Sequence, residues 1–156
     1  MPQKSSRPKN ITHHIMQTTI GLILVTIFLF LAGIHIYWGF GGKWGNDAAI
    51  PTTANNEKVI NPKLKECMVV AIALLSLSVL VLIKSEIIVY SLPNWLQEYG
   101  LWIISILFIV RAIGEFKYVG FFKKVKTTKF AQMDTKYFSP LCLFISILAT
   151  TLALTT

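Results

Sequence analysis

Charge is scarce in this chain of 156 residues: Asp, Glu, Lys and Arg make up 14% of it, hydrophobic residues make up 54%, and the mean hydropathy is +0.61. A soluble domain carries about 25% charged residues. The composition therefore excludes a soluble globular domain and a disordered tail. Cysteine is scarce too, because the sequence holds two, Cys67 and Cys142, and no C-x-x-C motif. A disulfide scaffold and a cysteine-rich metal site are not indicated, and we predict no metal and no cofactor.

Long apolar runs fill much of the chain. A membrane-crossing helix needs about 20 apolar residues. We predict an all-α integral membrane protein, a four-transmembrane-helix bundle that forms one domain over residues 1–156. The turn signature Ser91-Leu92-Pro93-Asn94 predicts a tight hairpin between the second and third helices. Ser139 and Pro140 predict the start of the fourth helix, as its N-cap and first residue. The predicted spans are about 15–38, 67–90, 95–114 and 139–155.

The two long loops, 39–66 and 116–137, carry most of the positive charge. They share one side of a four-span protein and hold ten lysines, against four basic residues (Lys4, Arg7, Lys9 and Lys84) on the other side. Lysine and arginine favour the cytoplasmic side. We therefore predict a multi-pass protein of the bacterial cytoplasmic membrane with both long loops in the cytoplasm. The net charge of +8 points to anionic lipid headgroups and not to nucleic acid.

A short pattern occurs twice. Gly33-x-x-x-Tyr37-x-Gly39-Phe40 recurs as Gly114-x-x-x-Tyr118-x-Gly120-Phe121, and each copy falls where a predicted helix ends. One interpretation is a two-plus-two parallel repeat about an axis along the membrane normal. Coincidence is the other, because four positions match.

Polar side chains near helix ends concentrate at the side of the long loops. Arg111 is the strongest signal, because a guanidinium in a span needs a carboxylate, carbonyls or an anionic ligand. Two interpretations stay open: a structural ion pair with Glu115 or Asp134, or contact with a phosphate or carboxylate of a lipid or metabolite. Arg111 and Glu115 are four residues apart, so on one helix they share a face.

His35 and Glu115 are the candidate proton-transfer groups. A histidine can exchange a proton near neutral pH, although one near a helix end often only hydrogen-bonds within the bundle. Trp38 and Trp44 either wall a pocket or serve as interfacial anchors. The candidate ligand-binding residues at this rim are Arg111, His35, Trp38, Trp44, Glu115, Tyr118 and Asp134. No residue is assigned a catalytic role beyond the two candidates.

Two groups of motifs resemble a family of small bacterial membrane proteins known as an uncharacterised domain of unknown function. The first is His35-x-Tyr37-Trp38-x-x-Gly41-Gly42-x-Trp44-Gly45. The second is Arg111-Ala-x-Gly114, followed by Tyr118-x-Gly120-Phe121-Phe122-Lys123, then Phe130-Ala-x-x-Asp134 and Ser139-Pro140-Leu141-Cys142. The resemblance implies four spans and no particular reaction.

Three functions are consistent with this sequence. The leading hypothesis is a non-catalytic membrane module whose polar and aromatic pocket binds a lipid headgroup or small amphiphile, with Arg111 as the anion contact. The second is a membrane enzyme acting on a lipid or hydrophobic metabolite through His35 or Glu115. The third is an accessory or self-protection subunit that binds another membrane protein through the loop 116–137. The partners consistent with the sequence are membrane lipids, a small amphiphile, and another membrane protein or a second copy of the chain. In the loop 116–137, lysines alternate with aromatics, as is typical of a bilayer interface.

Overall fold

A computed structural model describes residues 11–53, 55 and 57–156, and over these residues the protein is all-helical. Four helical runs are long and apolar enough to cross a membrane. Three are single helices and the fourth is assembled from α5, η1 and α6, so the chain is a multi-pass membrane protein of four spans. The elements are α1 (Ile11–Gly39), α2 (Asn46–Ala49), α3 (Leu64–Lys84), α4 (Asn94–Ile113), α5 (Lys129–Met133), the π-helical turn η1 (Asp134–Phe138) and α6 (Ser139–Thr155).

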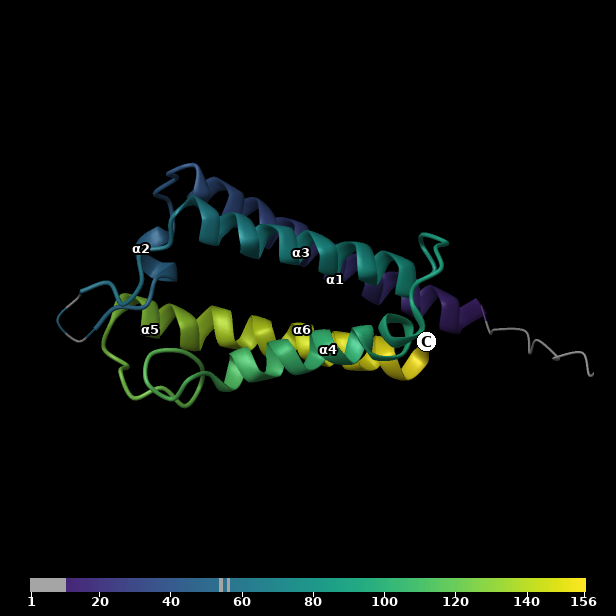
Figure 1. Ribbon diagram of the computed structural model, residues 1–156. Coiled ribbons are helices and arrows are strands. Elements are labelled where there is room, and N and C mark those ends of the chain that lie inside the picture. The colour runs from purple at the N-terminus through teal and green to yellow at the C-terminus, as the bar shows by residue number, and fades with distance from the viewer. Residues whose placement is uncertain (1–10, 54, 56) are drawn as a thin grey trace, which may run out of the picture.

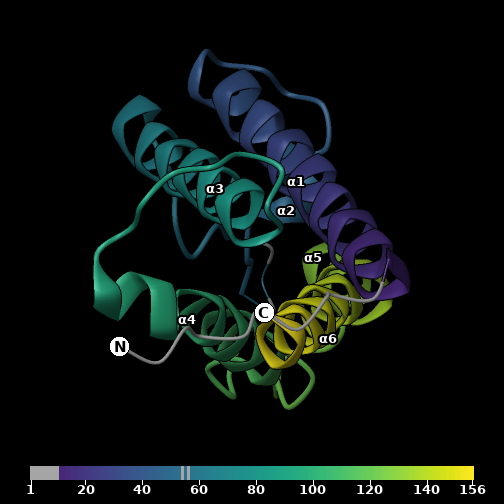
Figure 2. The same ribbon diagram turned by 90° about the vertical axis from the view of Figure 1, so that its right-hand side faces the viewer.

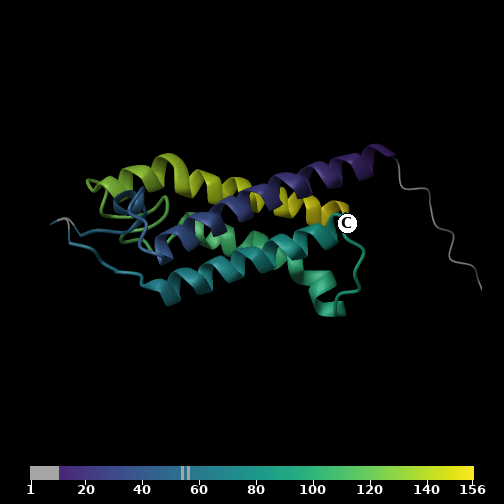
Figure 3. The ribbon, with the colours of Figure 1, turned by 90° about the horizontal axis from the view of Figure 1, so that it is seen from above.

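The four long helices are grouped as two antiparallel pairs. α1 packs along α3 and α4 packs along α6, whereas α3 touches α4 only sparingly. Figure 2 shows the two pairs end-on, α1 and α3 above and α4 and α6 below. Figures 1 and 3 show α2, α5 and the long loops at one end, with the C-terminus and the start of α1 at the other. The tight hairpin predicted between the second and third helices is therefore wrong, because each of those helices has its main partner elsewhere.

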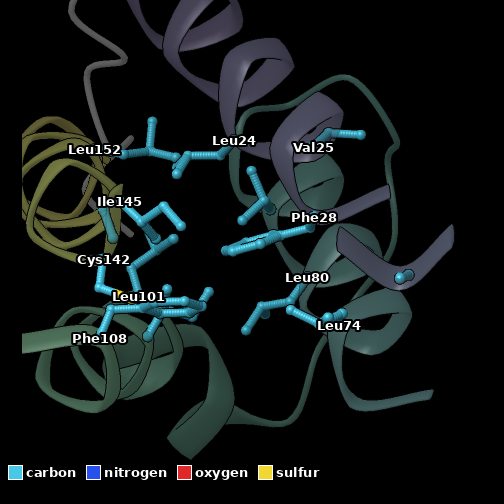
Figure 4. Packing of buried hydrophobic residues seen from close by; sticks show 14 of the residues in the cluster. Leu24, Val25, Phe28, Leu74, Leu80, Leu101, Phe108, Cys142, Ile145 and Leu152 are labelled. Atoms are coloured by element: carbon cyan, nitrogen blue, oxygen red, sulfur yellow. The ribbon is translucent and has the colours of Figure 1, made fainter. Parts of the chain in front are cut away.

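Interdigitating apolar side chains join the two pairs. Phe28 of α1 and Phe108 of α4 stack with ring centroids 5.6 Å apart, and Leu24, Ile145 and Leu152 surround them in Figure 4. Because lipid tails are as apolar as these side chains, close packing holds the helices together more than water exclusion does.

Hydroxyl groups add a polar contact within the α4–α6 pair. The Ser105 hydroxyl lies 3.0 Å from that of Ser146 and 2.7 Å from that of Thr150. Interhelical hydrogen bonds of this kind contribute about 0.6 kcal/mol each in membranes, so they supplement the packing rather than replace it.

The second helix ends at Lys84 and not near Tyr90. Ser85 is buried against Gly21 of α1, and Glu86 takes a left-handed backbone conformation with φ 57°. Residues 87–89 are then Ile-Ile-Val, and β-branched side chains favour a helix less than straight ones. The chain therefore leaves the helix at Ser85 and reaches α4 through an irregular connection that begins with a turn.

The fourth helical run begins at Lys129, ten residues earlier than Ser139. The Thr128 hydroxyl caps it by accepting from the Ala131 amide at 3.2 Å. Ser139 is therefore not an N-cap, and residues 129–137 are not loop. The run continues through Pro140 because η1 widens it: the Ser139 amide donates to the Asp134 carbonyl five residues back. A π-turn of this kind adds one residue to the helix, and here it precedes a proline that has no amide hydrogen to donate.

The two copies of the repeated pattern have different local structures, although the two-pair arrangement matches a two-plus-two grouping. Gly33 lies inside α1, with open space where a Cβ would be, whereas Gly114 follows the last residue of α4 with φ +83°. The basic residues Lys4, Arg7 and Lys9 lie outside the described part of the chain.

Packing between the two helix pairs predicts that two isoleucines of α6 contribute unequally to stability. Ile145 is fully buried in the core, and Ile147 on the same helix is exposed. Ile145→Ala is expected to lower the free energy of unfolding by about 2–5 kcal/mol, and Ile147→Ala to change it by less than about 0.5 kcal/mol. Reversible unfolding in detergent micelles measures both, and equal losses would contradict the packing described here.

Candidate functional site

A tight loop follows α4 and is closed by two glycines. Gly114 and Gly120 have φ of +83° and +88°, a region that favours glycine. Their backbones cross so closely that a Cβ on Gly120 would lie 2.2 Å from the Ile113 carbonyl oxygen. The Phe121 amide closes the loop by donating to the Ala112 carbonyl at 2.9 Å. This crossing points the Gly120 amide at η1.

Asp134, the first residue of η1, receives that amide. Its carboxylate is fully buried and accepts four hydrogen bonds: Oδ2 from the Gly120 amide (2.8 Å), Lys123 Nζ (3.0 Å) and the Ser139 hydroxyl (3.2 Å), and Oδ1 from Arg111 Nη2 (3.1 Å). An ionised carboxyl group offers about four acceptor positions. The hydrogen-bonding capacity of Asp134 is therefore filled from within the protein.

Lys123 is the buried counter-ion of Asp134. Its side chain is 1% exposed, and Nζ donates to Asp134 Oδ2, to the Gly120 carbonyl (2.8 Å) and to the Thr135 hydroxyl (2.7 Å). An ammonium group has three N–H donors, so all three have a partner. Asp134 and Lys123 together form a complete structural pair that ties the loop to the fourth helical run.

Arg111 is the incomplete member of this ion cluster (Arg111, Lys123 and Asp134). Its side chain is 35% exposed and pairs with Asp134 through Nη2 alone. Its Nη1 is buried and has no hydrogen-bond partner within the described part of the chain. Buried polar groups without partners are rare and costly. This nitrogen is the open position of the cluster.

The ion cluster joins the last turn of α4 to the fourth helical run. Asp134 is the sixth residue of the fourth helical run, and the residues from Asp134 to Thr155 rise by about 30 Å at 1.5 Å per residue, which is the thickness of the bilayer core. Arg111 lies in the last turn of α4. A hydrocarbon core that covered these residues would place both charged groups near the lipid headgroups.

Glu115 does not pair with Arg111, so this part of the prediction is wrong. α4 ends at Ile113, and Glu115 follows the reversal at Gly114, so the two residues do not share a helical face. The Glu115 carboxylate instead accepts from the Tyr118 amide at 3.1 Å, and it lies on the exposed outside of the loop. The Tyr118 ring lies beside the Lys117 ammonium, 5.0 Å from its centroid.

His35, Trp38 and Trp44 form a separate group at the end of α1. His35 Nδ1 donates to the Leu31 carbonyl at 2.8 Å, and its ring meets Trp38 edge-on at 5.4 Å. Trp38 Nε1 donates to the Trp44 carbonyl at 2.8 Å. Within the described residues, no hydrogen bond or ion pair joins this group to Arg111, Lys123 or Asp134. The structure thus brings Arg111 and Asp134 together and leaves the aromatic residues apart.

Lys123 is the site residue that sequence reasoning missed. In the sequence it is one of the lysines that alternate with aromatics between residues 116 and 137, whereas the structure buries it. Two features of the sequence could have distinguished Lys123 from the other lysines. Gly120 stands three residues before it, and Asp134 follows in the next helical segment.

A second polar region lies at the opposite end of the bundle. Lys84 Nζ donates to the Gln97 carbonyl at 2.9 Å. The cavity beside this contact has a volume of about 370 Å³ and is lined by Lys84, Asn94, Gln97, Glu98, Leu101, Ala153 and Thr156. It is distant from the ion cluster because it lies at the start of α4 and the end of α6.

Four apolar helical runs, with an ion cluster at one end of the bundle, define a small multi-pass membrane protein. The model of the family DUF3995, proteins of unknown function, matches residues 28–149. The chain belongs to this family, which confirms its resemblance to an uncharacterised family. The match includes all three members of the ion cluster. Neither the curated proteins nor the solved structures gave a match.

The crossing of the two glycines predicts that Gly120→Ala destabilises the protein. A left-handed alanine costs about 1–3 kcal/mol, and its Cβ would also collide with backbone. Gly33→Ala is the matched control, because Gly33 is helical and has open space around it; it should be neutral or stabilising. Thermal unfolding in detergent distinguishes the two, and equal midpoints would contradict the crossing.

The buried Lys123–Asp134 pair predicts that replacing Asp134 lowers the free energy of unfolding and that also replacing Lys123 restores part of it. Asp134→Asn leaves the Lys123 ammonium buried without a counter-ion, which costs about 3–5 kcal/mol. Combining it with Lys123→Met removes the stranded charge and should restore part of the loss. Glu115→Gln, at the exposed carboxylate, should change unfolding by less than about 0.5 kcal/mol. A double variant no more stable than Asp134→Asn would show that the pair is not the source of the effect.

Proposed function

We propose that this protein binds the anionic headgroup of a membrane amphiphile through Arg111. The observation that carries the proposal is the buried Nη1, which has an N–H to offer and no partner within the described residues. Guanidinium groups recognise phosphate and carboxylate with two parallel hydrogen bonds. Because Nη2 already holds Asp134, the ligand would pair with Nη1, which has to turn out of its buried position to meet the headgroup.

The charge of the cluster supports an anionic ligand. Arg111 and Lys123 bring two positive charges and Asp134 brings one negative charge. The excess of one positive charge lies at the edge of a low-dielectric layer, where an unpaired charge is costly. An anion beside Arg111 would neutralise it.

The position of Arg111 suits a ligand that arrives from the membrane. The side chain is partly exposed, and its depth matches that of lipid phosphates. A phospholipid and a smaller single-chain amphiphile share this chemistry. We assign the protein a binding role rather than catalysis, because neither candidate proton-transfer group, His35 or Glu115, is in hydrogen-bonding contact with Arg111, and the Asp134 carboxylate is saturated by its own partners.

We further propose that the long loops face the cytoplasm of a bacterium. They lie together at one end of the bundle (Figure 1), and with the adjoining helix ends the segments 39–66 and 116–137 hold ten lysines. Lysine excess favours that side, and the anionic lipids of the cytoplasmic leaflet would then be level with Arg111.

The test compares Arg111→Lys with Lys124→Gln. Lysine keeps the positive charge and can still pair with Asp134, but it has no second nitrogen for the ligand. Purified protein is stripped of lipid in a zwitterionic detergent and titrated with phosphatidylglycerol or dodecyl phosphate, with binding counted by native mass spectrometry. Arg111→Lys is expected to weaken binding about 10–100-fold, the range of a hydrogen bond to a charged group. Lys124→Gln should weaken it less than about 3-fold.

The two titrants identify the source of the anion. Tighter binding of phosphatidylglycerol supports a phospholipid, and tighter binding of dodecyl phosphate supports a small amphiphile. Equal losses in the two variants would mean that the basic surface attracts anions diffusely, which contradicts a site at Arg111.

A further inference from the structure

Two phenylalanine rings project together from the loop that follows α4. Phe116 and Phe122 are 58% and 65% exposed, and their ring centroids lie 6.4 Å apart. Neither ring is needed to fill the core. We name residues 114–126, which carry both rings, the aromatic hook.

Backbone hydrogen bonds pair the two arms of the hook, although it has no regular secondary structure. The Lys124 amide donates to the Phe116 carbonyl (3.1 Å) and the Val125 amide to the Lys117 carbonyl (3.0 Å), so its two arms are paired. The buried ammonium of Lys123 fixes its base. The rings are therefore held in place before they meet any partner, which lowers the entropy cost of binding.

Phe116 has a backbone conformation that needs an explanation. Its φ is 66°, a region in which a bulky side chain is an outlier. Such strain gathers at functional positions. Here it turns an apolar ring outward, away from the core that would otherwise stabilise it.

Positive charge surrounds the rings. Lys117, Lys124 and Lys126 are exposed, and the one acidic residue of the hook, Glu115, accepts from the Tyr118 amide. α4 crosses the hydrocarbon core in 20 residues, so the hook begins at headgroup level. Aromatic rings beside lysines suit the headgroup layer of an anionic leaflet. The rings insert between the headgroups, and the ammonium groups contact the phosphates.

We propose that the aromatic hook docks onto the anionic phospholipid surface of the leaflet that surrounds it, with Phe116 and Phe122 inserted and the three lysines on phosphates. This surface is separate from the Arg111 site. It contacts many lipids weakly and at once, whereas Arg111 holds one headgroup.

The experiment places a fluorophore on the hook. Phe122→Cys is labelled with a polarity-sensitive dye in the full-length Cys67→Ala, Cys142→Ala background, after circular dichroism has shown that the background is folded. Nanodiscs contain phosphatidylcholine alone or with a third of phosphatidylglycerol. Anionic discs should shift the emission to shorter wavelength and raise quenching by a lipid spin-labelled near its headgroup. High salt should reverse both changes, because exposed charges are screened.

Matched variants separate the hook from the rest of the positive surface. Lys124→Gln with Lys126→Gln should remove most of the difference between the two discs. Lys43→Gln with Lys65→Gln, which removes the same charge from the loop after α1 and the first turn of α3, should preserve it. Arg111→Lys should also preserve the difference between the two discs. A loss of binding at Arg111 can therefore be distinguished from a loss of membrane contact by the hook.

Two outcomes would overturn the proposal. In the first, the dye reports water in both kinds of disc. In the second, it is equally shielded in both and insensitive to salt, which would indicate contact with protein and not with an anionic surface.

Discussion

The buried Asp134 carboxylate is the group on which the polar end of this protein depends. A bare carboxylate that is fully buried in the protein is costly, and four donors from three segments make it tolerable. Gly120 must adopt a left-handed conformation to bring its amide there, and η1 carries Asp134 itself. The loop crossing, the burial of Lys123 and the position of Arg111 all follow from satisfying one charge.

Composition and apolar runs predicted the class of fold, because the need for about 20 apolar residues per span is independent of tertiary detail. The same reasoning failed where helix ends depend on contacts. Ser85 ends α3 against Gly21, a contact between residues distant in sequence. Ser139 and Pro140 resembled a helix start, but η1 carries the helix through them. The grouping into two pairs also depends on side-chain packing that no local pattern shows.

The candidate site was predicted in part. Arg111 and Asp134 stood out because charge in or beside a span is rare, and the structure pairs them. Helical spacing alone favours Glu115 as the partner of Arg111. The helix ends at Ile113, however, and Gly114 reverses the chain between the two residues. Lys123 is one of six lysines in its loop and differs from the others only in being buried. Asp134 and Lys123 have all their hydrogen bonds filled, whereas Arg111 has an unpaired nitrogen. This difference depends on the three-dimensional contacts and cannot be read from the sequence.

An experimental structure in nanodiscs that contain phosphatidylglycerol tests the central claim most directly. The account requires Lys123 enclosed on Asp134 and a phosphate oxygen within hydrogen-bonding distance of Arg111 Nη1. A guanidinium that holds Asp134 with both terminal nitrogens, or whose Nη1 meets a protein carbonyl with no lipid beside it, would contradict the account.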